Sequence, residues 1–146
     1  MTLEPADLAR FHASLERATA DPRFLDLFYD GFLSSSEDIR RIFAHSDMDR
    51  LKRKLKSSLG MMQLLIEGAP GVDMYFGYLG TLHRGFRIPF GLYARWVDAL
   101  IDALDRCDPD FSPELEQLWR RILDSALEAF RTAYDAESSG TPGHEA

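Results

Sequence analysis

The chain is poor in cysteine, because Cys107 is the only one among its 146 residues. It therefore cannot form an internal disulfide or a metal cluster held by several cysteines. Long apolar runs are also missing, and the first residues lack the basic start and apolar stretch of a signal peptide. These absences predict a soluble, cytoplasmic protein with no membrane span.

Positive charge is also in short supply. There are 17 Lys and Arg against 24 Asp and Glu, which gives a net charge of -7. Nucleic acids and anionic membranes attract a dominant positive surface, so neither is expected as the main partner. The hydrophobic fraction of 45% is enough for one folded domain. We expect this domain to cover residues 1–136, and residues 137–146, which are rich in Ser, Gly and Pro, to form a disordered tail.

Strand signals are absent, whereas helix start and stop signals recur along the whole chain. Capping residues followed by Pro or acidic residues open several segments, and apolar residues recur within them at helical spacing. The pattern predicts an all-α domain of about seven helices with a short third one. The expected helices begin near Pro5, Asp21, Glu37, Met48, Val72, Phe90 and Pro113, with Asp21, Asp47 and Ser112 as caps and Gly68 to Gly71 as a firm stop.

The order of these helices resembles the globin fold, and three places make the resemblance specific. Phe28-Tyr29, followed by Phe43, is similar to the second helix and the loop after the short third helix in bacterial single-domain globins and in the globin domain of flavohaemoglobins. Residues 83–93, with the sequence HRGFRIPFGLY, are similar to their proximal segment, in which a histidine is followed by Ile and then Tyr.

The start of the last helix agrees with this resemblance. Asp108-Pro109 and Trp119 are similar to the entry and first turns of the last globin helix, so that the similarity extends to about Tyr134. It implies a haem b cofactor, and the absence of a Cys-x-x-Cys-His motif implies that the haem is held non-covalently.

The resemblance makes His83 the proximal iron ligand, a role that suits a neutral imidazole. From its position alone, a surface histidine at a helix C-terminus explains His83 equally well. Tyr93 would lie against the proximal ring and help to orient it, although a core tyrosine explains it equally well.

Tyr29 is the candidate on the opposite, distal side of the iron. A phenol in an apolar pocket can donate a hydrogen bond to bound O2, and the alternative is a core tyrosine beside Phe28. Many relatives carry Gln or His where Leu51 stands, so Tyr29 would supply the main polar contact. His45 and Met48 are weaker candidates for a distal ligand, because a connecting segment usually exposes such groups to solvent.

The remaining haem contacts implied by the resemblance come from several helices. Phe43 would pack flat on the haem. A propionate could meet Lys54, Arg84 or Arg87, although most of the basic run at residues 50–56 is explained by a solvated helix face. The complete predicted set is Phe28, Tyr29, Phe43, Leu51, Lys54, Leu55, Leu82, His83, Arg87, Ile88, Tyr93 and Val97.

These residues favour a globin that reversibly binds O2, NO or CO, for gas binding or sensing. The alternative is a NO dioxygenase or peroxidase-like enzyme that depends on a separate reductase. The chain carries no flavin or nicotinamide domain, and Tyr134 stands where flavohaemoglobins have a proximal Glu, so we favour gas binding. A haem-free sensor is a third reading, which His83 and Tyr29 disfavour. The sequence leaves the oligomeric state open.

Overall fold

A computed structural model describes residues 3–68, 70–71, 74 and 90–138. Over these residues the chain is helical and contains no strand, as the sequence predicts. The helices are α1 (Pro5–Ala20), α2 (Phe24–Ser34), α3 (Glu37–Ile42), α4 (Met48–Ile66), the short 3-10 helix η1 (Phe90–Leu92), α6 (Tyr93–Cys107) and α7 (Pro113–Ser138). The helix predicted for residues 72–83 lies almost entirely outside the described residues.

Three of these helices begin at a side-chain cap. The Ser36 hydroxyl accepts a hydrogen bond from the backbone N–H of Asp38 at 3.1 Å. The Asp47 carboxylate accepts one from Arg50 at 3.2 Å, and the Ser112 hydroxyl accepts one from Leu115 at 3.1 Å. Each cap satisfies a backbone donor that the first helical turn leaves without a partner. The caps predicted at Asp47 and Ser112 are therefore confirmed.

The start predicted for the second helix is wrong by two residues, because the N-cap is Arg23 rather than Asp21. Asp21 does not cap α2, because its carboxylate binds the backbone N–H of Arg23 at 2.9 Å and the Arg23 guanidinium at 2.8 Å. This local turn delays the helix until Phe24. At the other end of the chain, α7 continues to Ser138 and so includes the first two residues of the expected tail.

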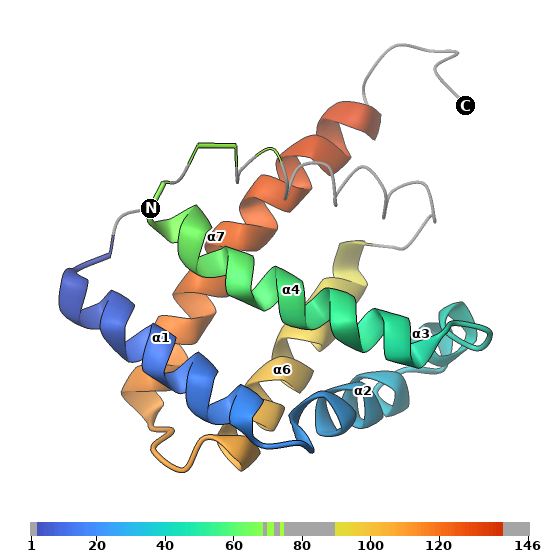
Figure 1. Cartoon of the computed structure of the whole chain (residues 1–146). Helices are drawn as coiled ribbons and strands as arrows, with labels where there is room; N and C mark the ends of the chain where they lie inside the picture. Colours follow the sequence, from blue (N-terminus) through green and yellow to red (C-terminus); the bar gives the residue numbers. More distant parts are fainter. Residues whose placement is uncertain (1–2, 69, 72–73, 75–89, 139–146) are drawn as a thin grey trace.

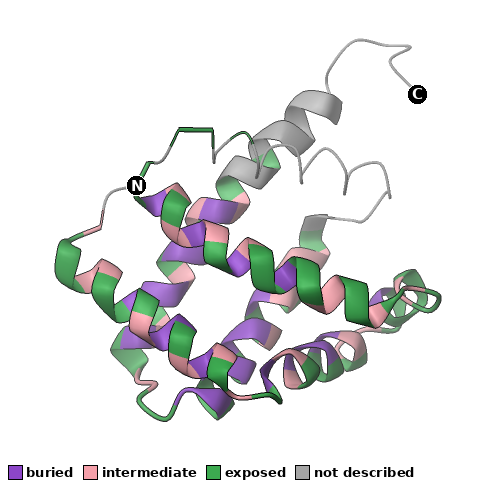
Figure 2. Cartoon of the chain, in the orientation of Figure 1, coloured by how far each residue is buried: buried purple, intermediate pink, exposed green. Residues whose placement is uncertain are grey.

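The helices cross one another rather than running as a parallel bundle (Figure 1). α2 packs mainly on α6, whereas α1 contacts α2, α4, α6 and α7. α4 crosses in front of α6 and α7 in this view. Figure 2 shows that the buried residues lie on the inward faces of the helices, as their amphipathic sequences require. Among the described residues, no helix is long and apolar enough to cross a bilayer.

The core contains the inward stripes that the sequence predicts. On α4, Leu55, Leu59 and Ile66 are buried, whereas Leu51 is only half-buried. α4 ends at Ile66, and Gly68 follows with a φ of 72°, a conformation that favours glycine after a helix. The stop predicted at Gly68 is therefore confirmed.

A buried polar network joins α1 to the corner between α6 and α7. The Asp108 carboxylate accepts hydrogen bonds from the Ser14 hydroxyl at 2.6 Å and from Arg17 Nε at 2.5 Å. The indole N–H of Trp119 donates to the Ser14 hydroxyl at 2.9 Å. Burial raises the pKa of Asp108, but the hydrogen bonds from Arg17 and Ser14 outweigh it and lower the pKa from its ordinary value. The network fixes α7 and the end of α6 relative to α1.

Candidate functional site

An aromatic cavity of about 100 Å³ lies where α2, α3, α4 and α6 meet. Tyr29 and Phe32 enter it from α2, and Tyr93 and Trp96 from α6. The remaining lining residues are Ile39, Ile42, Phe43, Leu51 and Leu92. A mostly apolar lining with a few polar groups is typical of sites for small molecules and cofactors.

Tyr29 is the polar group whose geometry is best defined in this cavity. The side chain is only 7% exposed, and its hydroxyl donates a hydrogen bond to the backbone carbonyl of Leu51 at 3.3 Å. Burial raises the pKa of Tyr29 to about 12, because a phenolate would lose its hydration. At neutral pH the phenol is therefore protonated and can serve as a hydrogen-bond donor.

A cluster of aromatic rings holds the wall behind Tyr29. The Phe28 ring meets Tyr29 edge-on at 4.7 Å between centroids and meets Trp96 edge-on at 5.9 Å. Phe32 stacks on Phe28 at 5.6 Å and meets Phe43 edge-on at 5.8 Å. These arrangements are the favoured ones for aromatic pairs, and they restrict how the rings can turn. The cluster therefore fixes the position of Tyr29 at the cavity.

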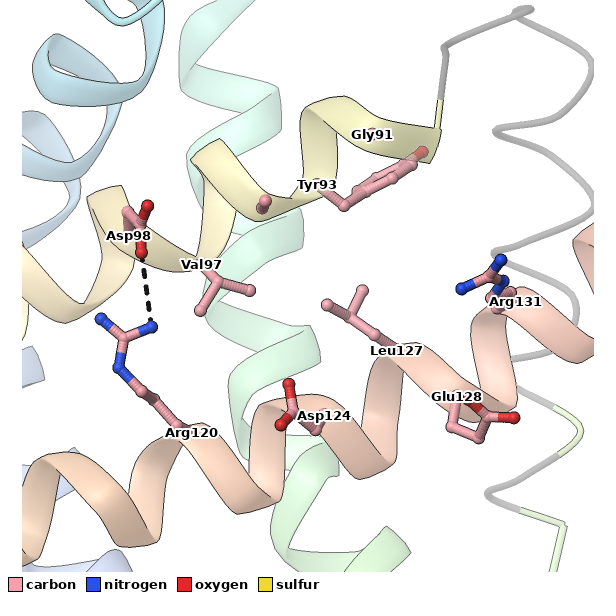
Figure 3. Close-up of a pocket in the computed structure, with 10 residues that line it drawn as sticks. Gly91, Tyr93, Val97, Asp98, Arg120, Asp124, Leu127, Glu128 and Arg131 are labelled. Atoms are coloured by element: carbon pink, nitrogen blue, oxygen red, sulfur yellow. Dashed lines mark hydrogen bonds and ion pairs between the residues drawn. The ribbon is translucent and has the colours of Figure 1, made fainter.

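A second cavity, of about 450 Å³, lies between α6 and α7 (Figure 3). Tyr93 lines both cavities, and Val97 and Leu127 add further apolar surface to the second one. Its rim is charged, and Arg120 bridges to Asp98 across the two helices at 3.3 Å. Tyr93 thus marks the boundary between the two cavities.

The structure brings together several residues that the sequence singles out as site residues. Tyr29, Phe43, Leu51 and Tyr93 all line the aromatic cavity, and Val97 joins Tyr93 in the second cavity. These residues come from α2, from the end of α3, from α4 and from α6. Their predicted roles toward a haem stay predictions, but their proximity is what those roles require.

Other predicted residues lie elsewhere in the described structure. Phe28 is fully buried but lines neither of these cavities, because its ring packs inside the aromatic cluster. Leu55 is buried on α4, whereas Lys54 and His45 are exposed. Met48 is half-buried and packs against the core.

Residues 75–89, which include most of the predicted proximal segment, lie outside the described residues. This part of the chain contains His83, together with Leu82, Arg84, Arg87 and Ile88. The assignment of His83 as iron ligand therefore depends on the sequence.

Sequence reasoning missed five lining residues of the aromatic cavity. They are Phe32, Ile39, Ile42, Leu92 and Trp96. Helical spacing could have found two of them, because Phe32 stands three residues after Tyr29 and Trp96 three after Tyr93, each one turn along the same face. Helical spacing predicts that these residues point inward. It does not show whether they line a cavity or fill the packed core.

The fold matches a known structure over nearly its whole length. A crystal structure of a protein from Pseudomonas aeruginosa PAO1, described as structurally highly homologous to a human haemoglobin, superposes with a TM-score of 0.82 and 31% sequence identity. The match covers 88% of this chain and 98% of the Pseudomonas chain. No family profile and no curated protein sequence matches the chain.

The chain therefore has the globin fold and belongs to the same family of bacterial single-domain globin-like proteins as this Pseudomonas protein. The observed helices and the aromatic cavity agree with the resemblance found in the sequence. A particular similarity to flavohaemoglobins stays a prediction.

Proposed function

We propose that this protein binds haem b non-covalently and uses the iron to bind O2, or another diatomic gas such as NO or CO, reversibly. The observation that carries the proposal is the aromatic cavity of a globin fold with the protonated, buried phenol of Tyr29 in its wall. A flat apolar ring system suits the apolar walls, and the phenol suits a polar ligand bound on one face of that ring system.

The residues present fit a haem on the described side of the site. Phe43 and Leu51 provide apolar surface in the aromatic cavity, and Tyr93 lines both cavities. We propose His83 as the axial ligand and Leu82, Arg87 and Ile88 as further contacts. The haem supplies the iron atom at which a gas binds.

The chain's own residues would control what happens at the iron. Tyr29 would donate a hydrogen bond to the partly negative bound O2, and this bond is strong where water is excluded. In the structure the same hydroxyl donates to the Leu51 carbonyl at 3.3 Å, so it must turn away from, or share, this weak bond when a ligand is present. The Leu51 side chain offers no second donor.

Haem titration tests this proposal directly. We expect the purified protein to take up one haem and to develop an intense Soret band. The variant His83→Ala should lose the spectrum of an iron with an axial imidazole, whereas the matched variant His45→Ala should keep it, because His45 is exposed. A His83→Ala protein with an unchanged spectrum would show that another residue holds the iron.

An enzyme activity is the second candidate, based on the sequence resemblance to flavohaemoglobins. With an added reductase, the protein would consume NO in the presence of O2 many times over. If NO consumption stops at one equivalent per haem, reversible gas binding is favoured over NO dioxygenation.

A further inference from the structure

The aromatic cavity reaches the surface of the molecule at the end of α3. Ile39 and Ile42 stand three residues apart on this helix, so they lie on the same face, about 4.5 Å apart along its axis. Both line the cavity, but Ile39 is 1% exposed whereas Ile42 is 39% exposed. One helical turn therefore leads from the buried part of the cavity to solvent.

Ile42 is the most exposed of the residues that line this cavity. Tyr29, Phe32 and Ile39 are buried, and the other lining residues are half-buried. The side chain of Ile42 thus touches the cavity on one side and water on the other. The wall of the cavity is thinnest at this position.

The end of α3 that carries Ile42 is only lightly held. α3 has six residues, and helices this short have little stability of their own. Among the described helices it packs mainly on α2, and Figure 1 shows it at the edge of the molecule. A small outward shift of its last turn would therefore disturb few contacts elsewhere in the core.

The chemistry of the cavity suits the passage of a diatomic gas. None of the described lining residues is charged. A small neutral gas can cross such a wall, whereas an ion would lose its hydration without gaining a partner. The volume of about 100 Å³ exceeds the ~10–15 Å³ that one water molecule needs. A gas that enters beside Ile42 reaches the same cavity as the phenol of Tyr29.

We propose that Ile42 is the gate through which a diatomic gas enters and leaves the aromatic cavity. This inference rests on the proposed haem function, because it assigns the route to the iron. A gate changes the height of one barrier that the gas crosses in both directions, so the association and dissociation rate constants change by the same factor. Tyr29 would instead act on the bound gas and change mainly the dissociation rate constant.

Two substitutions of opposite size test the gate. Ile42→Phe places a larger ring at the mouth of the cavity, and Ile42→Ala removes most of the side chain. The matched controls are Leu64→Phe and Leu64→Ala. Leu64 lies on α4, is also 39% exposed and does not line the aromatic cavity.

The rate constants for O2 are measured on haem-loaded protein by laser photolysis and stopped-flow mixing. Ile42→Phe should slow association and dissociation about fivefold, and Ile42→Ala should speed both about threefold. The ratio of the two rate constants should stay within about twofold of the wild-type ratio. The Leu64 variants should change each rate constant less than about twofold, as exposed substitutions usually do.

Three results would overturn the inference. They are unchanged rate constants in both Ile42 variants, equal changes in the Leu64 variants, or a change in dissociation alone. The last result would mean that Ile42 acts on the bound gas rather than on its passage.

The Soret absorbance of the same samples separates a failure of the gate from a failure of the proposed function. If the wild type takes up no haem, the proposed function is wrong, and quenching of tryptophan fluorescence by dissolved O2 tests the gate in the haem-free protein. Trp96 lines the aromatic cavity, and Trp119 is common to all variants. Ile42→Phe should then lower the quenching rate constant relative to Leu64→Phe, and equal quenching would contradict the gate.

Discussion

Replacing Asp108 by alanine should destabilise the fold more than any exposed substitution. The carboxylate is fully buried and accepts hydrogen bonds from the Ser14 hydroxyl, from two nitrogen atoms of Arg17 and from the backbone N–H of Asp110. Asp108→Ala removes the carboxylate that accepts all of these hydrogen bonds. It leaves the Ser14 hydroxyl without its acceptor and leaves Arg17 with only the exposed Asp110 carboxylate, 3.7 Å away.

The magnitude follows from the burial of each group. Removing one member of a buried ion pair typically costs about 3–5 kcal/mol. Arg17 is 32% exposed, so water can hydrate part of its guanidinium after the substitution. We therefore expect the free energy of unfolding to fall by about 3 kcal/mol, at the lower end of that range.

Urea unfolding followed by circular dichroism measures this loss. Asp110→Ala is the matched control, because Asp110 is 72% exposed and lies 3.7 Å from Arg17, so its loss should cost less than about 0.5 kcal/mol. Ser14→Ala should cost about 1–3 kcal/mol, since it leaves the buried indole N–H of Trp119 without its acceptor. A loss below about 1 kcal/mol for Asp108→Ala would refute the view that this network holds α1 to the α6–α7 corner.

The remaining predictions concern Tyr29 and pH. In the haem-loaded protein, Tyr29→Phe should speed O2 dissociation about 10- to 100-fold, the equivalent of one hydrogen bond to a partly charged acceptor; an unchanged rate in stopped-flow measurements would remove Tyr29 from the distal role. The difference in tyrosinate absorbance between the wild type and Tyr29→Phe should titrate near pH 12. The stability that this raised pKa provides is present below pH 10 and is lost as the pH rises through 12. Titration near pH 10 would contradict burial of the phenol. The pKa of Asp108 is lowered, so its contribution to the free energy of unfolding should be present above about pH 4 and lost as the pH falls through the folded-state pKa. In Asp108→Ala, the free energy of unfolding should therefore fall less steeply below about pH 4 than in the wild type. An equally steep fall in both proteins would contradict this.

Much of the fold is predictable from local sequence signals. Asp47 and Ser112 cap helices because their side chains reach a nearby backbone N–H, an interaction confined to a few residues. Asp21 misled the prediction because the same side chain can instead close a local turn with Arg23. A cap and a local turn at Asp21 start the helix at positions that differ by one or two residues, and composition alone does not decide between them.

The site is only partly predictable. Tyr29, Phe43 and Tyr93 stand out because a known family keeps these residue types in this order. Trp96 gives no such signal, since an inward aromatic on a helix looks the same in sequence whether it lines a cavity or fills the core. The network around Asp108 was also missed, because Ser14 and Asp108 are 94 residues apart and only the tertiary structure brings them together.

The central claim is that the aromatic cavity belongs to a haem site in which Tyr29 faces a gas bound to iron. The most direct test is the absorption spectrum of the purified, haem-loaded protein in its ferric form, in its ferrous form and after exposure of the ferrous form to O2. The account predicts an intense Soret band that shifts on reduction, shifts again when O2 is added and returns when O2 is removed. A protein that stays colourless after haem addition, or whose ferrous spectrum does not respond to O2, would contradict it.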